Sequence, residues 1–309
     1  MAEAPIDLAG VPSVPLAERM TYRDRTPREA VTAYCRRNPQ VVIGLTMVVL
    51  LLMIGIIGPL FVNTKEADPL SALPSLHPSR QYLLGTDDQG RNLIAVIVAG
   101  LPATLRIGFL AGGIGLGIGI ILGFLSGYLG GAVDAVVRVA VDTLITVPGL
   151  LILILIAASI KTFISVNIMA LVIASLAWPR PTRIIRSQVL TMRERAYVQV
   201  ARRSGMNTME IIVRELLPNI FPFLAAGFVG AVSGAILFSI GLEALGLGPQ
   251  NDPTLGMTIY WSIRFNAILR GLWWWWAPPI VILIVLLLGL LLLTIGLDEI
   301  ANPRLRRTA

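Results

Sequence analysis

Charged side chains are scarce in this chain. Asp, Glu, Lys and Arg make up 14% of its 309 residues, whereas a soluble globular domain has about 25%. Hydrophobic residues make up 55%, and the mean hydropathy is +0.78. This composition excludes an ordinary soluble domain and predicts an integral membrane protein.

Cysteine and histidine are almost absent, since each occurs once, as Cys35 and His77. A single cysteine excludes a disulfide within the chain, and these two residues cannot form a zinc cluster. Because neither lies in an apolar span, a Ser-His or Cys-His site inside the bilayer is also excluded. We therefore expect no metal site, and we expect that the chain is not an enzyme by itself.

A nucleotide-binding loop is missing as well. The pattern G-x-x-x-x-G-K-[ST] does not occur. The glycine-rich stretch GGIGLGIGIILG (112–123) lies inside an apolar block, where glycines allow helices to pack closely. Any ATP that drives this protein must be hydrolysed by a separate subunit, so we expect no cofactor in this chain.

Apolar blocks long enough to cross a bilayer, about 20 residues as a helix, occupy most of the chain. Five are clear, at 41–62, about 104–129, about 137–160, about 219–242 and 277–297. A sixth, 164–178, is short, and we expect its helix to run on through Pro179 and Pro181. The expected fold is therefore all-α, with six transmembrane helices and both termini on one side.

The arginines indicate which side that is. Six precede the first span, eight lie between Arg180 and Arg214, and three follow the last span, while the loops on the opposite side hold few basic residues. By the positive-inside rule, both termini and the segment 180–218 are cytoplasmic. The net charge of +7 is thereby explained without a nucleic-acid partner.

The charged segment that starts at Thr191 has the pattern of two short helices joined by a turn. Met192, Ala196 and Val200 recur at helical spacing and predict an apolar stripe on the first helix. Gly205 can adopt the left-handed conformation that ends a helix.

Asn207 and Glu210 have the spacing of a capping box for the second helix. We expect its apolar face to comprise Met209, Ile212, Val213 and Leu216, and we expect Pro218 to stop or bend it. A DNA-binding helix-turn-helix is disfavoured because both ends enter the bilayer within a few residues. A solvated loop explains the arginines but not the apolar faces. A helix that docks in a groove of another protein explains both.

This stretch resembles the EAA loop of ABC importer permeases, whose pattern is Glu-Ala-Ala, three residues, Gly, nine residues, Ile, one residue, Leu-Pro. Gln199 stands where that family has Glu, and Glu215 stands where it has Ile. The positions that match at the expected spacing are Ala201, Gly205, Leu217 and Pro218.

The resemblance extends over residues 30–307. Five stretches occur in the same order as in the C-type permease subunit of dipeptide and oligopeptide (Dpp/Opp) ABC importers, and a sixth, ANPRLR (301–306), also fits. The five are YLLGTDDQGRN (82–92), SGYLGGAVDAVVRVAVDTLITVPGLLILILI (126–156), ERAYVQVARRSG (194–205), RELLPNIFP (214–222) and LEALGLGPQ (242–250). This resemblance implies the type I ABC importer permease fold in a prokaryotic cell membrane.

The resemblance also implies partners: a second homologous permease subunit, two ATP-binding cassette subunits that bind ATP and Mg²⁺, and an extracytoplasmic solute-binding protein, all around a lipid bilayer. The residues expected to couple the chain to the ATPases are Gln199, Ala201, Arg202, Gly205, Met206, Met209, Ile212, Glu215, Leu217 and Pro218.

Two further polar groups are candidates for special roles. Asp134, Arg138 and Asp142 recur every four residues and could pair along one helix face, or Asp142 could face the pore. Asp87, Asp88 and Arg91 are too polar for lipid and predict a folded external element near the mouth rather than a substrate site. The run Trp273–Trp276 suits the outer membrane interface, with an aromatic clamp for sugars as an alternative.

The expected organisation is a cytoplasmic N-terminal segment (1–40), a first transmembrane helix (41–62), an external loop with a folded element (63–103), a five-helix permease core (104–297) with coupling helices at about 191–217, and a cytoplasmic tail (298–309). Peptides are the leading cargo, and oligosaccharides or nickel complexes are alternatives. An ion-coupled secondary transporter is the alternative of another class, and it would rest on Asp142.

Overall fold

The computed structural model of the chain describes residue 36 and residues 38–301. Most of the N-terminal segment 1–40, including Cys35, and residues 302–309 of the tail lie outside that part. In the part described, the secondary structure is helical, apart from one isolated bridge between Thr86 and Asn92. The all-α expectation is confirmed.

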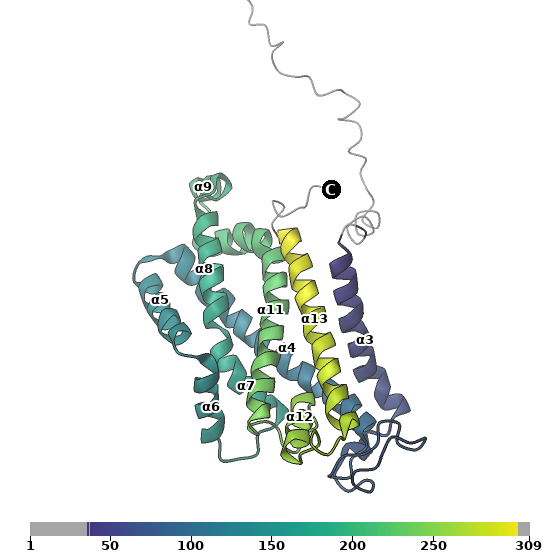
Figure 1. The fold of residues 1–309 in the computed structure, drawn as a ribbon. Helices are drawn as coiled ribbons and strands as arrows, with labels where there is room; N and C mark the ends of the chain where they lie inside the picture. Colours follow the sequence, from purple (N-terminus) through teal and green to yellow (C-terminus); the bar gives the residue numbers. More distant parts are fainter. Residues whose placement is uncertain (1–35, 37, 302–309) are drawn as a thin grey trace, which may run out of the picture.

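The helices stand roughly side by side and form a bundle (Figure 1). The long ones are α3 (Pro39–Phe61), α4 (Leu93–Leu129), α11 (Leu217–Ala244) and α13 (Trp273–Ala301). The shorter ones are α5 (Gly131–Thr146), α6 (Gly149–Ser159), α7 (Val166–Ala177), α8 (Pro179–Arg193), α9 (Ala196–Arg203), α10 (Thr208–Glu210) and α12 (Leu255–Arg264), with a 3₁₀ turn η1 (Thr64–Ala67) and a π-helical segment η2 (Ile211–Leu216).

Four helices are long and apolar enough to cross a membrane, if α10, η2 and α11 are taken as one helix, Thr208–Ala244. Two bent pairs raise the number to six among the described residues if each pair is one span. The axes of α5 and α6 meet at 86°, and those of α7 and α8 at 42°. The expected span at about 137–160 is therefore not one uninterrupted helix, because the chain leaves the helical conformation at Val147 and Pro148. The helix at 164–178 does run on past Pro179 as expected, with a bend.

Two predicted boundaries are also wrong. The second apolar helix begins at Leu93 rather than near 104, so the loop between α3 and α4 ends at Asn92. Asn92 caps α4 through a hydrogen bond that its side chain accepts from the Ile94 N–H at 3.1 Å, and Pro102 lies inside the helix without ending it. The last helix extends beyond 297, through Asp298 to Ala301.

The core is built around α4, whose glycines let its neighbours approach closely. A Cβ atom on Gly112 would lie 2.7 Å from the Val232 nitrogen of α11, and one on Gly119 would lie 2.6 Å from the Pro181 Cβ of α8. Both contacts are closer than a real side chain permits. The packing role predicted for the glycine-rich stretch 112–123 is confirmed.

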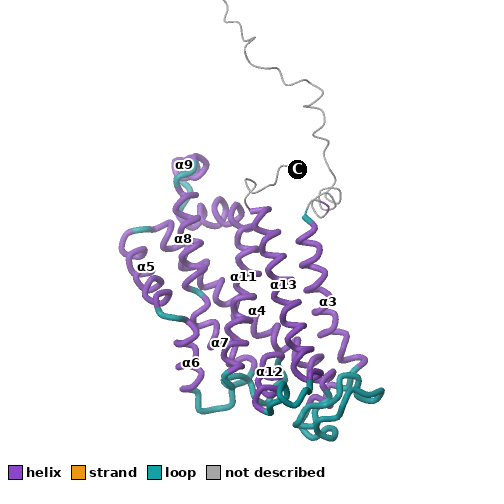
Figure 2. Tube along the Cα trace, in the orientation of Figure 1, coloured by secondary structure: helices purple, strands orange, loops and turns teal. Residues whose placement is uncertain are grey.

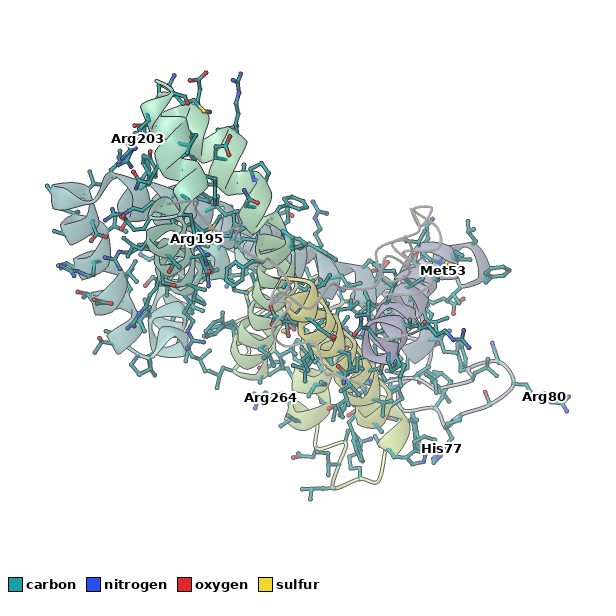
Figure 3. All side chains as sticks on the ribbon, turned by 90° about the horizontal axis from the view of Figure 1, so that it is seen from above. Met53, His77, Arg80, Arg195, Arg203 and Arg264 are labelled. Atoms are coloured by element: carbon teal, nitrogen blue, oxygen red, sulfur yellow. The ribbon has the colours of Figure 1, made fainter. Side chains whose placement is uncertain are left out.

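The two ends of the bundle differ. The start of α3, the end of α13 and α9 lie at one end, while the loop 62–92 and α12 lie at the other (Figures 1 and 2). Viewed from above, Arg203 on α9 lies at one margin of the molecule and Arg80 of the loop at the opposite margin (Figure 3).

Candidate coupling element and cavity

We define the coupling element as residues 194–217, which join α8 to α11. Its turn has the geometry expected from the sequence. Gly205 has a φ of +83°, the Gly205 N–H donates to the Arg202 carbonyl at 3.2 Å, and the Met206 N–H donates to the Ala201 carbonyl at 3.2 Å. Such bonds close the end of a helix when glycine takes the left-handed conformation.

The second helix of the element begins with the predicted capping box. The Glu210 N–H donates to Asn207 Oδ1 at 2.9 Å, and the Asn207 N–H donates to Glu210 Oε2 at 3.2 Å. Glu210 also forms an ion pair with Arg214 at 3.5 Å. The start of this helix is therefore fixed by residues of the element itself.

The apolar stripe predicted for the first helix is wrong. Met192 belongs to α8, and the chain breaks at Glu194 and Arg195 before α9 begins, so the three residues do not share one continuous helix. Val200 is 63% exposed. The buried residues of α9 are instead Val198 and Ala201, three positions apart.

The apolar face predicted for the second helix is divided between two surroundings. Ile212 and Leu216 are buried against α4, α8 and α11 of the same chain, so the expectation that Ile212 faces a partner is wrong. Met209 and Val213 are 63% and 53% exposed. Together with Val200, they form the set that we call the docking face (Val200, Met209, Val213).

Pro218 does not stop the helix, but the helical run changes direction in this region, which fits the expected alternative of a bend (Figure 1). The turn before it widens, with the Leu217 N–H donating to the Ile212 carbonyl five residues back. A π turn commonly occurs inside a longer helix, and it precedes a residue that has no N–H to donate. Thr208–Ala244 is consequently an unbroken helical run of 37 residues, although it is not straight (Figure 1).

Gln199 and Arg202 attach the element to its own chain. Gln199 Nε2 donates to the Arg193 carbonyl at 3.3 Å, and Arg202 Nη2 donates to the Tyr128 hydroxyl at 3.5 Å. The Arg202 guanidinium also lies 5.8 Å from the centre of the Tyr128 ring. Glu215 and Leu217 are partly buried, and Pro218 is exposed.

The carboxylates of α5 pair with α8 rather than along α5. Asp134 binds Arg186 through two hydrogen bonds, one of them from Nη2 to Oδ2 at 2.6 Å, and Ser126 also donates to it at 2.5 Å. Asp142 lies 3.9 Å from Arg183. The predicted pairing of Asp134 and Asp142 with Arg138 is therefore not among the ion pairs of the described residues.

At the other end of the bundle, Asp87, Asp88 and Arg91 lie in the folded loop 62–92. Asp87 is fully buried, and it accepts hydrogen bonds from Arg91 Nε at 2.6 Å and from the Arg91 and Gln89 N–H groups at 2.9 Å. Asp88 binds Arg270, which joins this loop to the segment between α12 and α13. These residues hold the loop together.

The tryptophan run, like the second helix of the coupling element, contains both buried and exposed residues. Trp274 and Trp275 are 5% and 0% exposed and belong to a cluster with Leu93, whereas Trp273 is 56% exposed. The interpretation as a membrane-interface belt fails for the two buried indoles, because protein rather than lipid headgroups covers them. They also do not line the cavity described next, which removes the support for an aromatic clamp there.

A cavity of about 410 Å³ lies between α4, α5, α6, α7, α8, α11 and α13. It extends from Phe223 and Asp298, near the end that carries the coupling element, to Phe238 deeper along α11. Gly230 and Gly234 contribute to its wall, and a Cβ atom on either would meet open space. Its charged lining residues are Arg180 and Asp298, and the rest of the wall is mainly apolar.

Sequence reasoning did not single out Glu243, which is fully buried at the end of α11. Its carboxyl accepts hydrogen bonds from Ser239 Oγ at 2.7 Å and Thr254 Oγ1 at 2.8 Å. A Cβ on Gly256 would overlap Glu243 Oε2, and Thr254 caps α12. Glu243 therefore clamps the start of α12 to α11. The glycines around LEALGLG were the signal that could have revealed this tight packing.

These features indicate a class of protein: a multi-pass membrane protein with a mainly apolar cavity among its helices and exposed apolar residues on the segment 194–217. The sequence also matches the family model described as binding-protein-dependent transport system inner membrane component over residues 119–307. The chain belongs to this family, whose members are permease components rather than catalytic subunits.

Individual relatives agree with the family. The chain is 29% identical over 272 residues to the dipeptide transport system permease protein DppC of Bacillus subtilis, covering 88% of this chain and 84% of that one. It is 29% identical over 230 residues to DppC of Alkalihalophilus pseudofirmus, covering 74% and 75%. It is also 29% identical over 183 residues to the oligopeptide transport system permease protein OppC of Mycobacterium tuberculosis, covering 59% and 63%.

Proposed function

We propose that this chain is a transmembrane permease subunit of an ATP-driven, binding-protein-dependent importer of dipeptides or oligopeptides. The observation that carries the proposal is the continuous helix Thr208–Ala244. One end of it bears Met209 and Val213 of the docking face, and its middle forms the cavity wall at Gly230 and Gly234. The docking face and the cavity wall are therefore connected by one unbroken helical run, which turns where the segment at the end of the bundle joins α11 (Figure 1).

The proposed topology has six spans: α3, α4, α5 with α6, α7 with α8, α11, and α13. Both termini and the coupling element face the cytoplasm. The arginine-rich segment 180–214 supports this orientation, as does the common end at which the start of α3, the end of α13 and α9 lie (Figure 1). The proposed location is the cytoplasmic, or inner, membrane of a prokaryotic cell.

The docking face has the chemistry of a helix that lies in a groove of another protein. Val200, Met209 and Val213 are more than half exposed at the end proposed to be cytoplasmic, and this chain does not cover them. A separate ATPase subunit with an apolar groove would bury them. Two such subunits would hold the ATP and Mg²⁺, since this sequence has no phosphate-binding loop.

The residues that line the cavity form one side of the proposed translocation pathway. A second, homologous permease would complete it, and an extracytoplasmic solute-binding protein would deliver cargo at the end that carries the loop 62–92. The wall at Gly230 and Gly234 lacks side chains and is mainly apolar, so it offers few groups that would select among the cargo's side chains. This suits a pathway for peptides of varied sequence, with selection made outside the membrane.

The first test is to purify the chain from its native membrane in mild detergent and identify the proteins that accompany it. A second permease, ATP-binding subunits and a binding protein are expected. The complex, reconstituted in vesicles, should take up a labelled dipeptide when ATP is supplied and no ion gradient is present. Uptake that requires an ion gradient and no ATPase would instead establish a secondary transporter. Uptake of an oligosaccharide or nickel complex, but not of peptides, would show that the proposed peptide cargo is wrong.

The pathway can be tested by filling it. Gly234→Phe places a ring in the open space of the cavity, so uptake should fall by at least about tenfold while assembly with the ATPases persists. Gly117→Phe is the matched control, because a Cβ there also meets open space but the position does not line the cavity. Equal uptake by both variants would place the pathway elsewhere.

A further inference from the structure

Helix α5 is bounded by non-helical residues at both ends. At its start, Gly130 and Gly131 have φ values of +68° and +56°, and a Cβ on Gly131 would meet no atom within 4 Å. At its end, the chain is extended at Val147 and Pro148, and α6 continues at 86° to α5. Loops are visible at both junctions (Figure 2). The helix is therefore not held in place by continuity with α4 or α6.

Apolar packing holds α5 only weakly. Within α5, all of which the structure describes, Val141 is the single buried residue. Val136 and Val139 are 70% and 65% exposed, although they lie in the same helix. Few apolar contacts within this chain therefore fix α5, and its position against the rest of the chain depends largely on other interactions.

The strongest of these interactions is the pair formed by Asp134 and Arg186. Two parallel hydrogen bonds join the carboxylate to the guanidinium, and the side chains are 17% and 22% exposed. Ser126 of α4 donates a third hydrogen bond to the same carboxylate. Bidentate, charge-assisted pairs are both stronger and more directional than single hydrogen bonds.

The second pair between the same two helices is much weaker. Asp142 and Arg183 lie 3.9 Å apart, and their side chains are 53% and 65% exposed. Water screens such a pair, and pairs of this kind contribute little. The Asp134–Arg186 pair is thus the principal polar tether between α5 and α8.

The position of α5 determines part of the cavity wall, because Leu144 and Ile145, near its end, line the cavity. We propose that Asp134 and Arg186 are positioning residues for transport: their bidentate pair fixes α5 against α8 and so holds Leu144 and Ile145 in the wall. This inference rests on the proposed function of the cavity. The two residues act through α5 and touch no cargo.

The transport test uses the whole complex, with its binding protein, in vesicles supplied with ATP and a labelled dipeptide. Asp134→Asn should lower the uptake rate by about tenfold, because it removes the charge from both hydrogen bonds. Arg183→Gln is the control for the exposed pair and should change the rate by less than about twofold. The exchanged double variant, Asp134→Arg with Arg186→Asp, should recover most of the loss, since pairing rather than either residue is required.

The position of α5 is measured separately by spin labels at Val139 on α5 and Gln188 on α8, in a chain that carries Cys35→Ser. The unmodified pair should give a narrow distance distribution, Asp134→Asn a broad one, and the exchanged variant a narrow one again. If Asp134→Asn does not fold, Arg186→Lys takes its place, because it keeps the charge and loses the parallel bonds.

Unchanged uptake and an unchanged distribution in the single variants would overturn the proposal. It would also be overturned if the exchanged variant stayed as broad and as inactive as the single ones. The distance measurement needs only the purified chain. If the unmodified complex shows no ATP-driven uptake, the proposed function fails, while the tether is still tested by the distances.

Discussion

Met209 offers a test that separates docking from folding. It is 63% exposed and is the second residue of its helix, after the cap at Asn207. An aspartate at this position lies in the first turn, where a negative charge stabilises the helix by about 0.3–1 kcal/mol. Met209→Asp should therefore leave the folding of the chain intact, and any loss of ATPase binding can be attributed to the docking face.

The size of that loss follows from the exposed fraction. Burying a whole methionine side chain contributes about 1.5–3 kcal/mol, and the 63% that this chain leaves exposed corresponds to about 1–2 kcal/mol on docking. A carboxylate pressed into an apolar groove adds a desolvation cost of at least about 1 kcal/mol. We expect Met209→Asp to weaken ATPase binding by about 2–3 kcal/mol, which is roughly 30-fold to 150-fold.

The assay is the recovery of ATPase subunits with the purified chain over a series of dilutions. Thr208→Asp is the matched control, because it places the same charge one residue earlier and leaves Met209 in place. This control should bind within about threefold of the original chain. The reasoning fails if Met209→Asp retains its ATPases at every dilution, because a face that tolerates a buried carboxylate is not a docking face.

The remaining predictions concern glycines. Gly205→Ala should lower ATP-driven uptake several-fold, because alanine at a φ of +83° strains the turn by about 1–2 kcal/mol. Gly205→Asn should lower uptake less, because asparagine tolerates this conformation; a larger loss with asparagine than with alanine would count against the role of the turn. Gly112→Ala should destabilise the chain by about 1–3 kcal/mol, seen as a lower melting temperature in detergent, because its Cβ would lie 2.7 Å from the backbone of α11. Gly113→Ala, whose Cβ meets its nearest atom at 3.7 Å, should melt within about 1 °C of the original; equal melting of both variants would refute the close packing.

The predictable parts of the coupling element were those that depend on short-range chemistry. The turn at Gly205 and the capping box of Asn207 and Glu210 follow from residue types at fixed spacing, and both are present. An amphipathic pattern carries less information. It showed that Met209, Ile212 and Val213 share an apolar character, but it could not show that Ile212 packs on the same chain while the other two are exposed.

The parts that could not be predicted depend on long-range packing. Pro102 lies within α4 and Pro148 marks a sharp bend, although proline alone favours a break at each position. The difference is that α4 is buried on both sides of Pro102, whereas α5 beside Pro148 is largely exposed. The cavity is likewise a product of helices far apart in sequence, and no local pattern specifies it.

The π-helical turn before Pro218 joins the two halves of the proposed mechanism. Met209 and Gly234 lie on one unbroken helical run, which changes direction where it joins α11 (Figure 1). A movement of the docking face would therefore reach Gly234 through this turn. Another part of the cavity wall comes from α5, which the Asp134–Arg186 pair holds to α8. A part of the wall that moves with α11 and a part that is tethered would together convert such a movement into a change of cavity width.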